Sequence, residues 1–306
     1  MQSTRDIKKR IRSVKNISQI TKAMEVVSAT KMRKSQEFAI RARPFATASL
    51  ELLNNLLLRT ETLPPFLIPR PVKKTAVLVV TSDKGLAGAF NANVLRKAEA
   101  HIAGINIPYT LVTVGKKARD HFFLRNISID RSFWGFGDYT KIQDTLPVAD
   151  YLLNGFSSVA WDELYAVYTN FRSTLRQETV VKKILPATRE GLEDAVRGIL
   201  PERGRFAEGV SGESKFAAGY NFEYAFEPSS AEILESLIPQ ILRMHLHHII
   251  LESNASEHSA RMVAMKNASE SAGELITDLS LVYNKTRQAG ITRELTEITA
   301  GSTSTA

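Results

Sequence analysis

The carboxyl-terminal stretch of the chain, Ala255 to Gly301, contains no proline and extends over about a dozen helical turns at ~3.6 residues per turn. A typical globular helix has ~10 to 14 residues, so a helix of this length needs a partner along its side. Heptad-like spacing is present at Leu275, Leu279, Val282 and Ala289. The sequence therefore predicts a long helix that packs against a second long helix.

The amino-terminal stretch, Met1 to Leu58, supplies the candidate partner, and Pro44 is its only proline. Its apolar residues recur in steps of three or four, with a change of phase near Ile17: Ile7, Ile11, Val14, Ile17, Ile20, Met24 and Val27. Lys31 and Lys34 take the next positions, so a regular heptad seam is not expected to continue. In the carboxyl-terminal helix, small residues allow a second backbone to approach closely: Ala255, Ser256, Ser259, Ala260, Ala264 and Ala268. We predict an irregular, antiparallel coiled coil.

Positive charge is concentrated in the amino-terminal helix. Residues 1–43 carry twelve Lys and Arg against the acids Asp6, Glu25 and Glu37, a balance of +9, whereas the whole chain carries +8. A helix of this kind predicts an acidic partner surface. The alternative is a solvated basic face without a partner.

Composition excludes several classes of protein. At 306 residues with 43% hydrophobic content, the chain is long enough for one domain plus an extension. It has no run of eighteen apolar residues, and its start lacks the apolar core of a secretory signal, so we expect it to stay on the cytoplasmic side. The absence of cysteine excludes disulfides and cysteine-ligated zinc.

Between the terminal helices the period of hydrophobicity changes. Strands and helices alternate, with strands expected at 75–81, 107–114, 127–132, 163–170 and 178–185 and helices at 91–103, 116–124 and 141–157. This order predicts an α/β sheet that is mostly parallel and has an antiparallel edge. Residues 198–228, rich in glycine and charge, are predicted to form a loop or insertion.

The turn Thr81–Asn91 (TSDKGLAGAFN) joins a predicted strand to a helix and invites a phosphate-binding interpretation. It lacks the Gly-Lys-Ser/Thr ending of a P-loop and the acidic residue of a dinucleotide site, so a structural turn is favoured. His245 and His248 share a helical face with Glu252 but lack a third clear metal ligand. The sequence predicts no catalytic set, cofactor or metal site.

Three stretches together resemble the signature regions of the gamma subunit of F-type ATP synthases, in the same order. They are RDIKKRIRSVKNISQITKAMEVVSATKMRKSQ (Arg5–Gln36), VTSDKGLAGAFN (Val80–Asn91) and the segment from Ala255 to Gly301. In that family the terminal helices form a shaft inside a ring of three alpha and three beta subunits, and the α/β domain lies near the epsilon subunit and the membrane c-ring. The resemblance implies a non-catalytic rotor subunit that couples ion-driven rotation to ATP synthesis or hydrolysis, peripheral on the cytoplasmic face of a bacterial inner membrane.

The implied organisation is a central Rossmann-like α/β domain with a shaft made of the two terminal helices. The expected parts are the shaft helix 1–62, the α/β domain 72–197, the insertion 198–228, the shaft helix 229–301 and the tail 302–306.

The resemblance also implies contact residues. Four in RQAGITRELTEI match family positions that touch the catch loops of alpha and beta: Arg287, Gln288, Thr292 and Glu297. Lys22 and Met24, in ITKAM, match the facing part of the amino-terminal helix, although the spacing also permits Met24 as a core residue. Phe226 and Glu227 resemble a segment at the foot near the c-ring and epsilon, with Phe226 in place of an expected tyrosine.

Two other functions remain open at this stage. The turn TSDKGLAG motivates a nucleotide-dependent α/β enzyme, and the basic amino-terminal run motivates a coiled coil that binds nucleic acid. The basic run lacks the interleaved aromatic residues of a specific nucleic-acid site, and the shaft interpretation with no nucleic-acid partner is preferred.

Overall fold

A computed structural model describes residues 3–41, 45, 48–49, 52–53, 55–56, 60, 63–136, 140–188, 190–192, 227 and 229–303. Along the chain, the long helix α1 (Thr4–Arg41) precedes a central sheet with its own helices, and the long helix α7 (Ser230–Thr303) follows it. The chain forms two compact units. The helical unit contains Met1–Ala29 and Arg261–Ala306, and the α/β unit contains Thr30–Ala260.

The sheet of the α/β unit has five strands in the order β3-β2-β1-β4-β5. They are β1 (Thr75–Val80), β2 (Tyr109–Val114), β3 (Arg131–Phe133), β4 (Glu163–Phe171) and β5 (Gln177–Leu185). The first four pair in parallel, and β5 pairs antiparallel with β4. The predicted mixed sheet is thereby confirmed.

Strand β3 begins later than the predicted strand 127–132. Ile127 and Ile129 pack instead against the core between the sheet and two of the helices, and only Arg131–Phe133 pairs with β2. The apolar pattern before Arg131 therefore reports burial against helices, which a period of two cannot distinguish from strand pairing.

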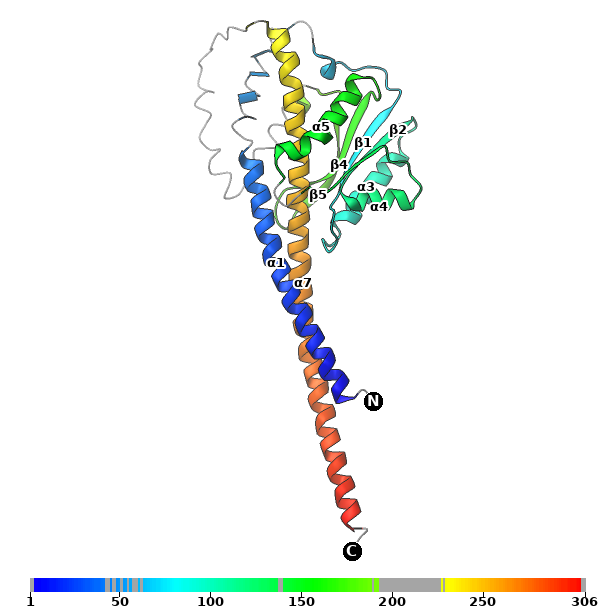
Figure 1. The fold of residues 1–306 in the computed structure, drawn as a ribbon, viewed down its shortest axis with the longest axis vertical. Helices are drawn as coiled ribbons and strands as arrows, with labels where there is room; N and C mark the ends of the chain where they lie inside the picture. The colour runs from blue at the N-terminus through cyan, green and yellow to red at the C-terminus, as the bar shows by residue number, and fades with distance from the viewer. Residues whose placement is uncertain are drawn as a thin grey trace. The chain divides into compact units, whose positions relative to one another are not determined.

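Helices cover both faces of this sheet, with α3 (Phe90–Ala103) and α4 (Lys116–Leu124) on one face and α5 (Ile142–Ser157) and α7 on the other (Figure 1). All six residues of β1 are buried. Side chains alternate along a strand. Val77 and Val79 therefore belong to the core on the face covered by α3 and α4, and Leu78 and Val80 belong to the core on the face covered by α5 and α7.

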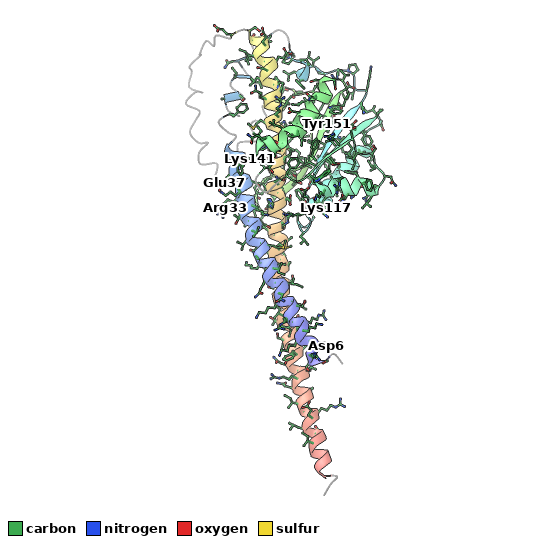
Figure 2. All side chains as sticks on the ribbon, viewed as in Figure 1. Asp6, Arg33, Glu37, Lys117, Lys141 and Tyr151 are labelled. Carbon is green, nitrogen blue, oxygen red and sulfur yellow. The ribbon has the colours of Figure 1, made fainter. Side chains whose placement is uncertain are left out.

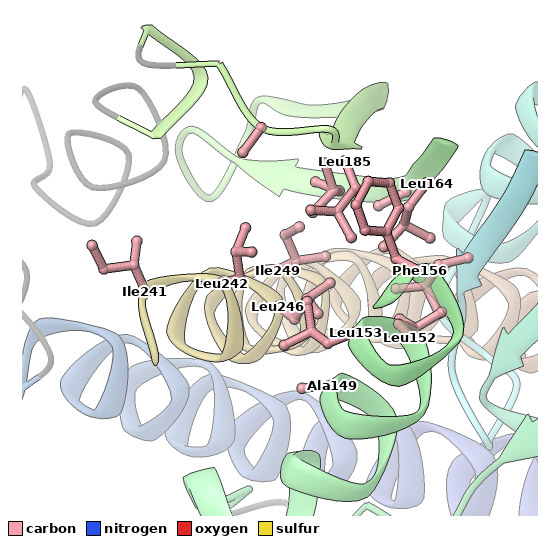
Figure 3. Packing of buried hydrophobic residues seen from close by; sticks show 14 of the residues in the cluster. Ala149, Leu152, Leu153, Phe156, Leu164, Leu185, Ile241, Leu242, Leu246 and Ile249 are labelled. Atoms are coloured by element: carbon pink, nitrogen blue, oxygen red, sulfur yellow. The ribbon is translucent and has the colours of Figure 1, made fainter. Parts of the chain in front are cut away.

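The first part of α7 is a layer of the α/β unit. Its Leu242, Leu246 and Ile249 pack with Leu152 and Phe156 of α5 (Figure 3). The predicted division assigned the whole of 229–301 to the shaft, but the compact unit includes α7 as far as Ala260. Burial on several sides of this part of α7 accounts for the difference, since a helix buried in this way needs more than one partner.

Two of the small residues predicted to face the other long helix instead hold the β4–β5 hairpin. Ser256 Oγ donates to the Thr169 carbonyl at 3.3 Å, and Ser259 Oγ donates to the Thr174 carbonyl at 3.0 Å. Of the predicted insertion 198–228 the structure describes only Glu227, and residues 304–306 of the predicted tail lie outside the described part.

Histidines in α7 are buried in the α/β unit. Burial, with help from Lys182 and His248, lowers the pKa of His245 to about 3. Burial also lowers the pKa of His247 to about 4, where His248 lowers it further and Asp144 opposes the shift. His247 Nδ1 lies 2.9 Å from the Thr145 hydroxyl of α5. Both histidines are therefore neutral in the folded chain at neutral pH.

We expect the α/β unit to lose stability as pH falls below about 6.5. The unfolded chain takes up protons there, whereas folded His245 and His247, with pKa values of about 3 and about 4, do not. Linkage gives a loss of about 2 kcal/mol per histidine between pH 7.5 and pH 5.0. Denaturant unfolding at the two pH values measures it. The variant His245→Gln/His247→Gln should lose less between the same pH values, and an unchanged loss would contradict this assignment.

Candidate functional site: the outer surface of the helical unit

In the helical unit, α1 and α7 run antiparallel (Figure 1). Ser18 Oγ lies 3.5 Å from Ser269 Oγ, and Ser269 Oγ also lies 3.4 Å from the Ser18 carbonyl oxygen, to which it donates. This pair fixes the register of the two helices.

The inward face of α1 follows a heptad pattern without a break. Steps of four and three join the less exposed positions Ile7, Ile11, Val14, Ser18, Thr21, Glu25 and Ser28. The predicted change of phase near Ile17 is therefore wrong. The seam keeps its phase but changes chemistry, from aliphatic to mainly hydroxyl side chains.

Buried hydroxyl groups are tolerated in this seam because the helix itself satisfies them. Thr21 Oγ1 donates to the Ile17 carbonyl at 3.0 Å, and Ser28 Oγ donates to the Met24 carbonyl at 2.7 Å. Such bonds to the preceding turn avoid the cost of an unpaired buried hydroxyl. Small side chains also let the α7 backbone come close.

The large aliphatic residues of this part of α1 are consequently on the outside. Their exposed fractions are 51% for Ile17, 59% for Ile20, 58% for Val26 and 50% for Val27. Three of them were predicted to lie on the packed stripe. The apolar pattern was read correctly as helical but was assigned to the wrong face.

In the helical unit, α7 shows the same division. Met265 and Ala272 are buried, whereas Leu275 and Val282, predicted seam positions, are 39% and 49% exposed. Further along, where α7 continues past the amino-terminal end of α1 (Figure 1), three aliphatic residues are exposed: Ile291, Leu295 and Ile298. These are spaced four and three residues apart, so they form one stripe on the helix.

Lys22 and Met24 lie in the middle of α1. Lys22 is exposed, and its Nζ lies 2.9 Å from Glu25 Oε2. Met24 is half-buried, at the border between the seam and the outer face, so it is only partly a core residue.

The other predicted contact residues lie near the end of α7. Arg287, Gln288 and Thr292 are exposed, and Thr292 Oγ1 donates to the Gln288 carbonyl at 3.0 Å. Glu297 lies on the same helix, and its side chain is outside the described part.

These residues form two groups at different levels. The Ser18–Ser269 register places Lys22 beside Met265, and Arg287 is 22 residues further along α7, about 33 Å at ~1.5 Å per residue. The predicted contact residues therefore do not form one compact site. Of the predicted foot segment, Glu227 is exposed and Phe226 lies outside the described residues.

The positive charge follows α1. In the helical unit α1 carries seven cations, all exposed, against Asp6 and Glu25: Arg5, Lys8, Lys9, Arg10, Arg12, Lys15 and Lys22. Figure 2 shows the side chains standing out along α1, with Asp6 labelled near its amino-terminal end. The outer surface of α1 is thus both basic and apolar.

The TSDKGLAG turn uses its polar groups internally. Asp83 accepts hydrogen bonds from the backbone N–H of Lys116 at 2.9 Å and of Gly135 at 2.8 Å. Lys116 is the first residue of α4, so the Asp83 carboxylate accepts the first N–H of that helix, whereas the helix that follows the turn is α3. Asn91 Nδ2 donates to Ser82 Oγ at 2.8 Å and closes the turn. The arrangement supports a structural turn.

Histidines 245 and 248 do not assemble a metal site in the described residues, where no group of three potential ligands is present. His248 Nε2 lies 3.3 Å from Glu252 Oε1. Within the same residues, no helix has both the length and the apolar character needed to span a membrane.

A family profile described as ATP synthase matches residues 3–304. The ATP synthase gamma chain of Roseiflexus castenholzii is 41% identical over 310 residues, covering 98% of each chain. The chain belongs to the ATP synthase gamma chain family. The gamma chain of Chloroflexus aurantiacus is 39% identical over 308 residues, again covering 98% of each chain.

Solved structures share the fold of this gamma chain family member. A chain of the Euglena gracilis mitochondrial ATP synthase, in a structure of OSCP, F1 and c-ring, aligns with a TM-score of 0.65 at 22% identity, covering 98% of this chain and 94% of that one. A chain of the Tetrahymena thermophila central stalk and c-ring aligns with a TM-score of 0.56 at 21% identity, covering 82% and 99%.

Two isoleucines of α1 test the inward and outward faces of this helix. Ile7 is 2% exposed and Ile20 is 59% exposed. We expect Ile7→Ala to lower the free energy of unfolding by about 2 kcal/mol or more and Ile20→Ala to change it by less than about 0.5 kcal/mol. Denaturant unfolding followed by helical circular dichroism makes the comparison. Equal losses would show that the assignment of the two faces is wrong.

Proposed function

We propose that this chain is the central rotor shaft of an ATP synthase. The observation that carries the proposal is the inverted middle part of α1, in which Ser18, Thr21 and Ser28 lie inside and the large aliphatic residues Ile17, Ile20, Val26 and Val27 lie outside. Fully burying one such side chain is worth about 1.5 to 3 kcal/mol. Several half-exposed aliphatic side chains on one pair of helices favour a partner that encloses them.

The partners would be three alpha and three beta subunits around the helical unit, and the epsilon subunit and c-ring around the α/β unit. We assign Lys22, Met24, Arg287, Gln288, Thr292 and Glu297 to contacts with alpha and beta. Phe226 and Glu227 are assigned to the foot. Their two levels on the shaft suit a partner ring that grips it at more than one height.

The chain itself would be non-catalytic, with ATP chemistry on the surrounding subunits. The turn Thr81–Asn91 supports this view because its polar side chains Asp83 and Asn91 are engaged in hydrogen bonds within the α/β unit. The complex would hold the chain at the cytoplasmic face of a membrane. Rotation of the c-ring, driven by ions, would turn the shaft and impose successive conformations on beta.

Reconstitution tests the shaft function directly. Purified alpha and beta subunits of the same organism are assayed for ATP hydrolysis alone, with the full chain, and with a chain truncated before Arg287. We expect a large gain with the full chain, one copy per three alpha and three beta, and a smaller gain with the truncation. A chain that forms no complex on gel filtration and gives no gain would overturn the proposal.

The outer aliphatic residues should matter for assembly and not for folding. We expect Ile17→Ser/Ile20→Ser to weaken binding to the alpha–beta ring by at least about tenfold, because burial of two isoleucines is lost. Binding is measured by competition with labelled full chain. Leu124→Ser, which changes a 79% exposed leucine of the α/β unit, is the matched control and should leave affinity unchanged.

A further inference from the structure

Three side chains of α7 bond to α5 or to a residue just before it in the α/β unit. The pairs are Arg243 Nε with Asp150 Oδ1 at 2.7 Å, His247 Nδ1 with Thr145 Oγ1 at 2.9 Å, and Asn254 Nδ2 with Thr140 Oγ1 at 3.1 Å. The Thr145 hydroxyl donates to the Ile142 carbonyl at 2.9 Å, so from His247 it accepts the Nδ1 proton of the neutral ring. We call these pairs the α5 row.

The α5 row lies on one side of α7. At about 100° per residue, His247 and Asn254 are turned from Arg243 by about 40° and about 20° around the helix. Ser256 and Ser259, which bond to the β4–β5 hairpin, are turned from Arg243 by about 220° and about 160°. These two serines form a hairpin row, so α7 is held by hydrogen bonds on two opposite sides.

The serines of the hairpin row bond outside their own helix. A helical serine can donate to the carbonyl of the preceding turn, as Ser280 does to Ile276 at 2.6 Å. Ser256 and Ser259 donate to the hairpin instead, and both side chains are buried. A bond broken here leaves a buried hydroxyl without water, which is costly.

Hydrogen bonds resist rotation of α7 about its own axis more sharply than the aliphatic core does. Contacts such as those of Leu246 and Ile249 (Figure 3) are non-directional. A rotation of about 20° moves a side-chain end at the ~5 Å radius of a helix by about 2 Å, which breaks a hydrogen bond. The two rows move in opposite directions when α7 rotates, so no shift of the whole helix restores both.

We propose that the α5 row and the hairpin row fix the rotational angle of α7 within the α/β unit and thereby transmit torque from this unit to α7. The inference rests on the proposed function, in which the α/β unit is turned and α7 continues beyond Ala260 into the helical unit. The residues of both rows are positioning residues. Without them, part of each rotation of the α/β unit is lost as rotation of α7 within it.

Angular fluctuation of the rotor tests the proposal. The chain has no cysteine, so Leu124→Cys, on a helix that covers the face of the sheet away from α7 (Figure 1), gives one attachment site for a bead. The labelled chain is assembled with alpha and beta subunits, and the ring is fixed to a surface. The bead angle is recorded at low ATP while the complex waits for nucleotide. Its variance rises as the connection between the α/β unit and α7 softens.

Each row is removed with little change of shape. Thr140→Val/Thr145→Val removes the two hydroxyls of the α5 row, and Ser256→Ala/Ser259→Ala removes the hairpin row. We expect either pair alone to raise the variance by less than about 1.5-fold, and both pairs together to raise it at least about twofold, because each row restrains α7 when the other is lost.

Two controls separate torque transmission from stability. Ile249→Val, in the buried core of α7, keeps both rows and should lower Tm without changing the variance. Thr140→Ser/Thr145→Ser keeps the hydroxyls and, combined with the two serine variants, should leave the variance at the level of the serine variants alone.

Several results would overturn the proposal. They are a combined variant whose variance equals that of Ile249→Val, and threonine-to-serine changes that soften the rotor as much as threonine-to-valine changes. If the combined variant does not assemble, the two single-row variants decide, and a variance no higher than that of Ile249→Val rejects the proposal. The proposed function is judged separately, since a Leu124→Cys chain with both rows intact that shows no ATP-driven rotation would reject the shaft itself and the transmission of torque with it.

Discussion

The close approach of α1 and α7 is the constraint on which the helical unit depends. Around the contact of Ser18 with Ser269, α1 fills the seam with hydroxyl residues, although Ile7 and Met265 are also buried in it. Aliphatic residues such as Ile17 and Ile20 must then point outward. A thicker, leucine-filled seam would be more stable, but it would leave the outer surface polar and give an enclosing ring little to hold. The close packing of the two helices and the apolar outer surface of α1 therefore both follow from the small side chains in the seam.

Helix α7 belongs to both units, and its side chains change accordingly. From Leu234 to Ile250 it supplies a core layer, and the buried neutral His245 and His247 belong to that layer. From Arg261 onward it is an outward-facing helix with one packed side. One helix therefore carries both Ser256 and Ser259, which bond the β4–β5 hairpin in the α/β unit, and Arg287 in the helical unit.

Much of the fold follows from periodicity. The alternation of strands and helices, the parallel core and the antiparallel β5 were all predictable, and α4 was predicted at its observed bounds. Periodicity gave the wrong result where the buried residues are not the apolar ones, or where apolar residues are buried outside a strand. The hydroxyl seam of Ser18, Thr21 and Ser28 carries no apolar signal, and β3 was misplaced because Ile127 and Ile129 pack against helices. The contact residues came from the resemblance, and only the register of the two helices separates them into two levels.

A surface that is apolar and basic at once suits a partner that changes as a shaft turns. Aliphatic contact is non-directional and depends mainly on the area removed from water, so it varies little with the angle of the shaft. Exposed ion pairs contribute about 0.2 to 1 kcal/mol each, enough to favour one orientation but not to lock it. A deeply buried ion pair would cost several kcal/mol to break and would stop rotation at one position. The exposed cations of α1, from Arg5 to Lys22, remain in the weak range, so the ring can exchange one set of contacts for the next.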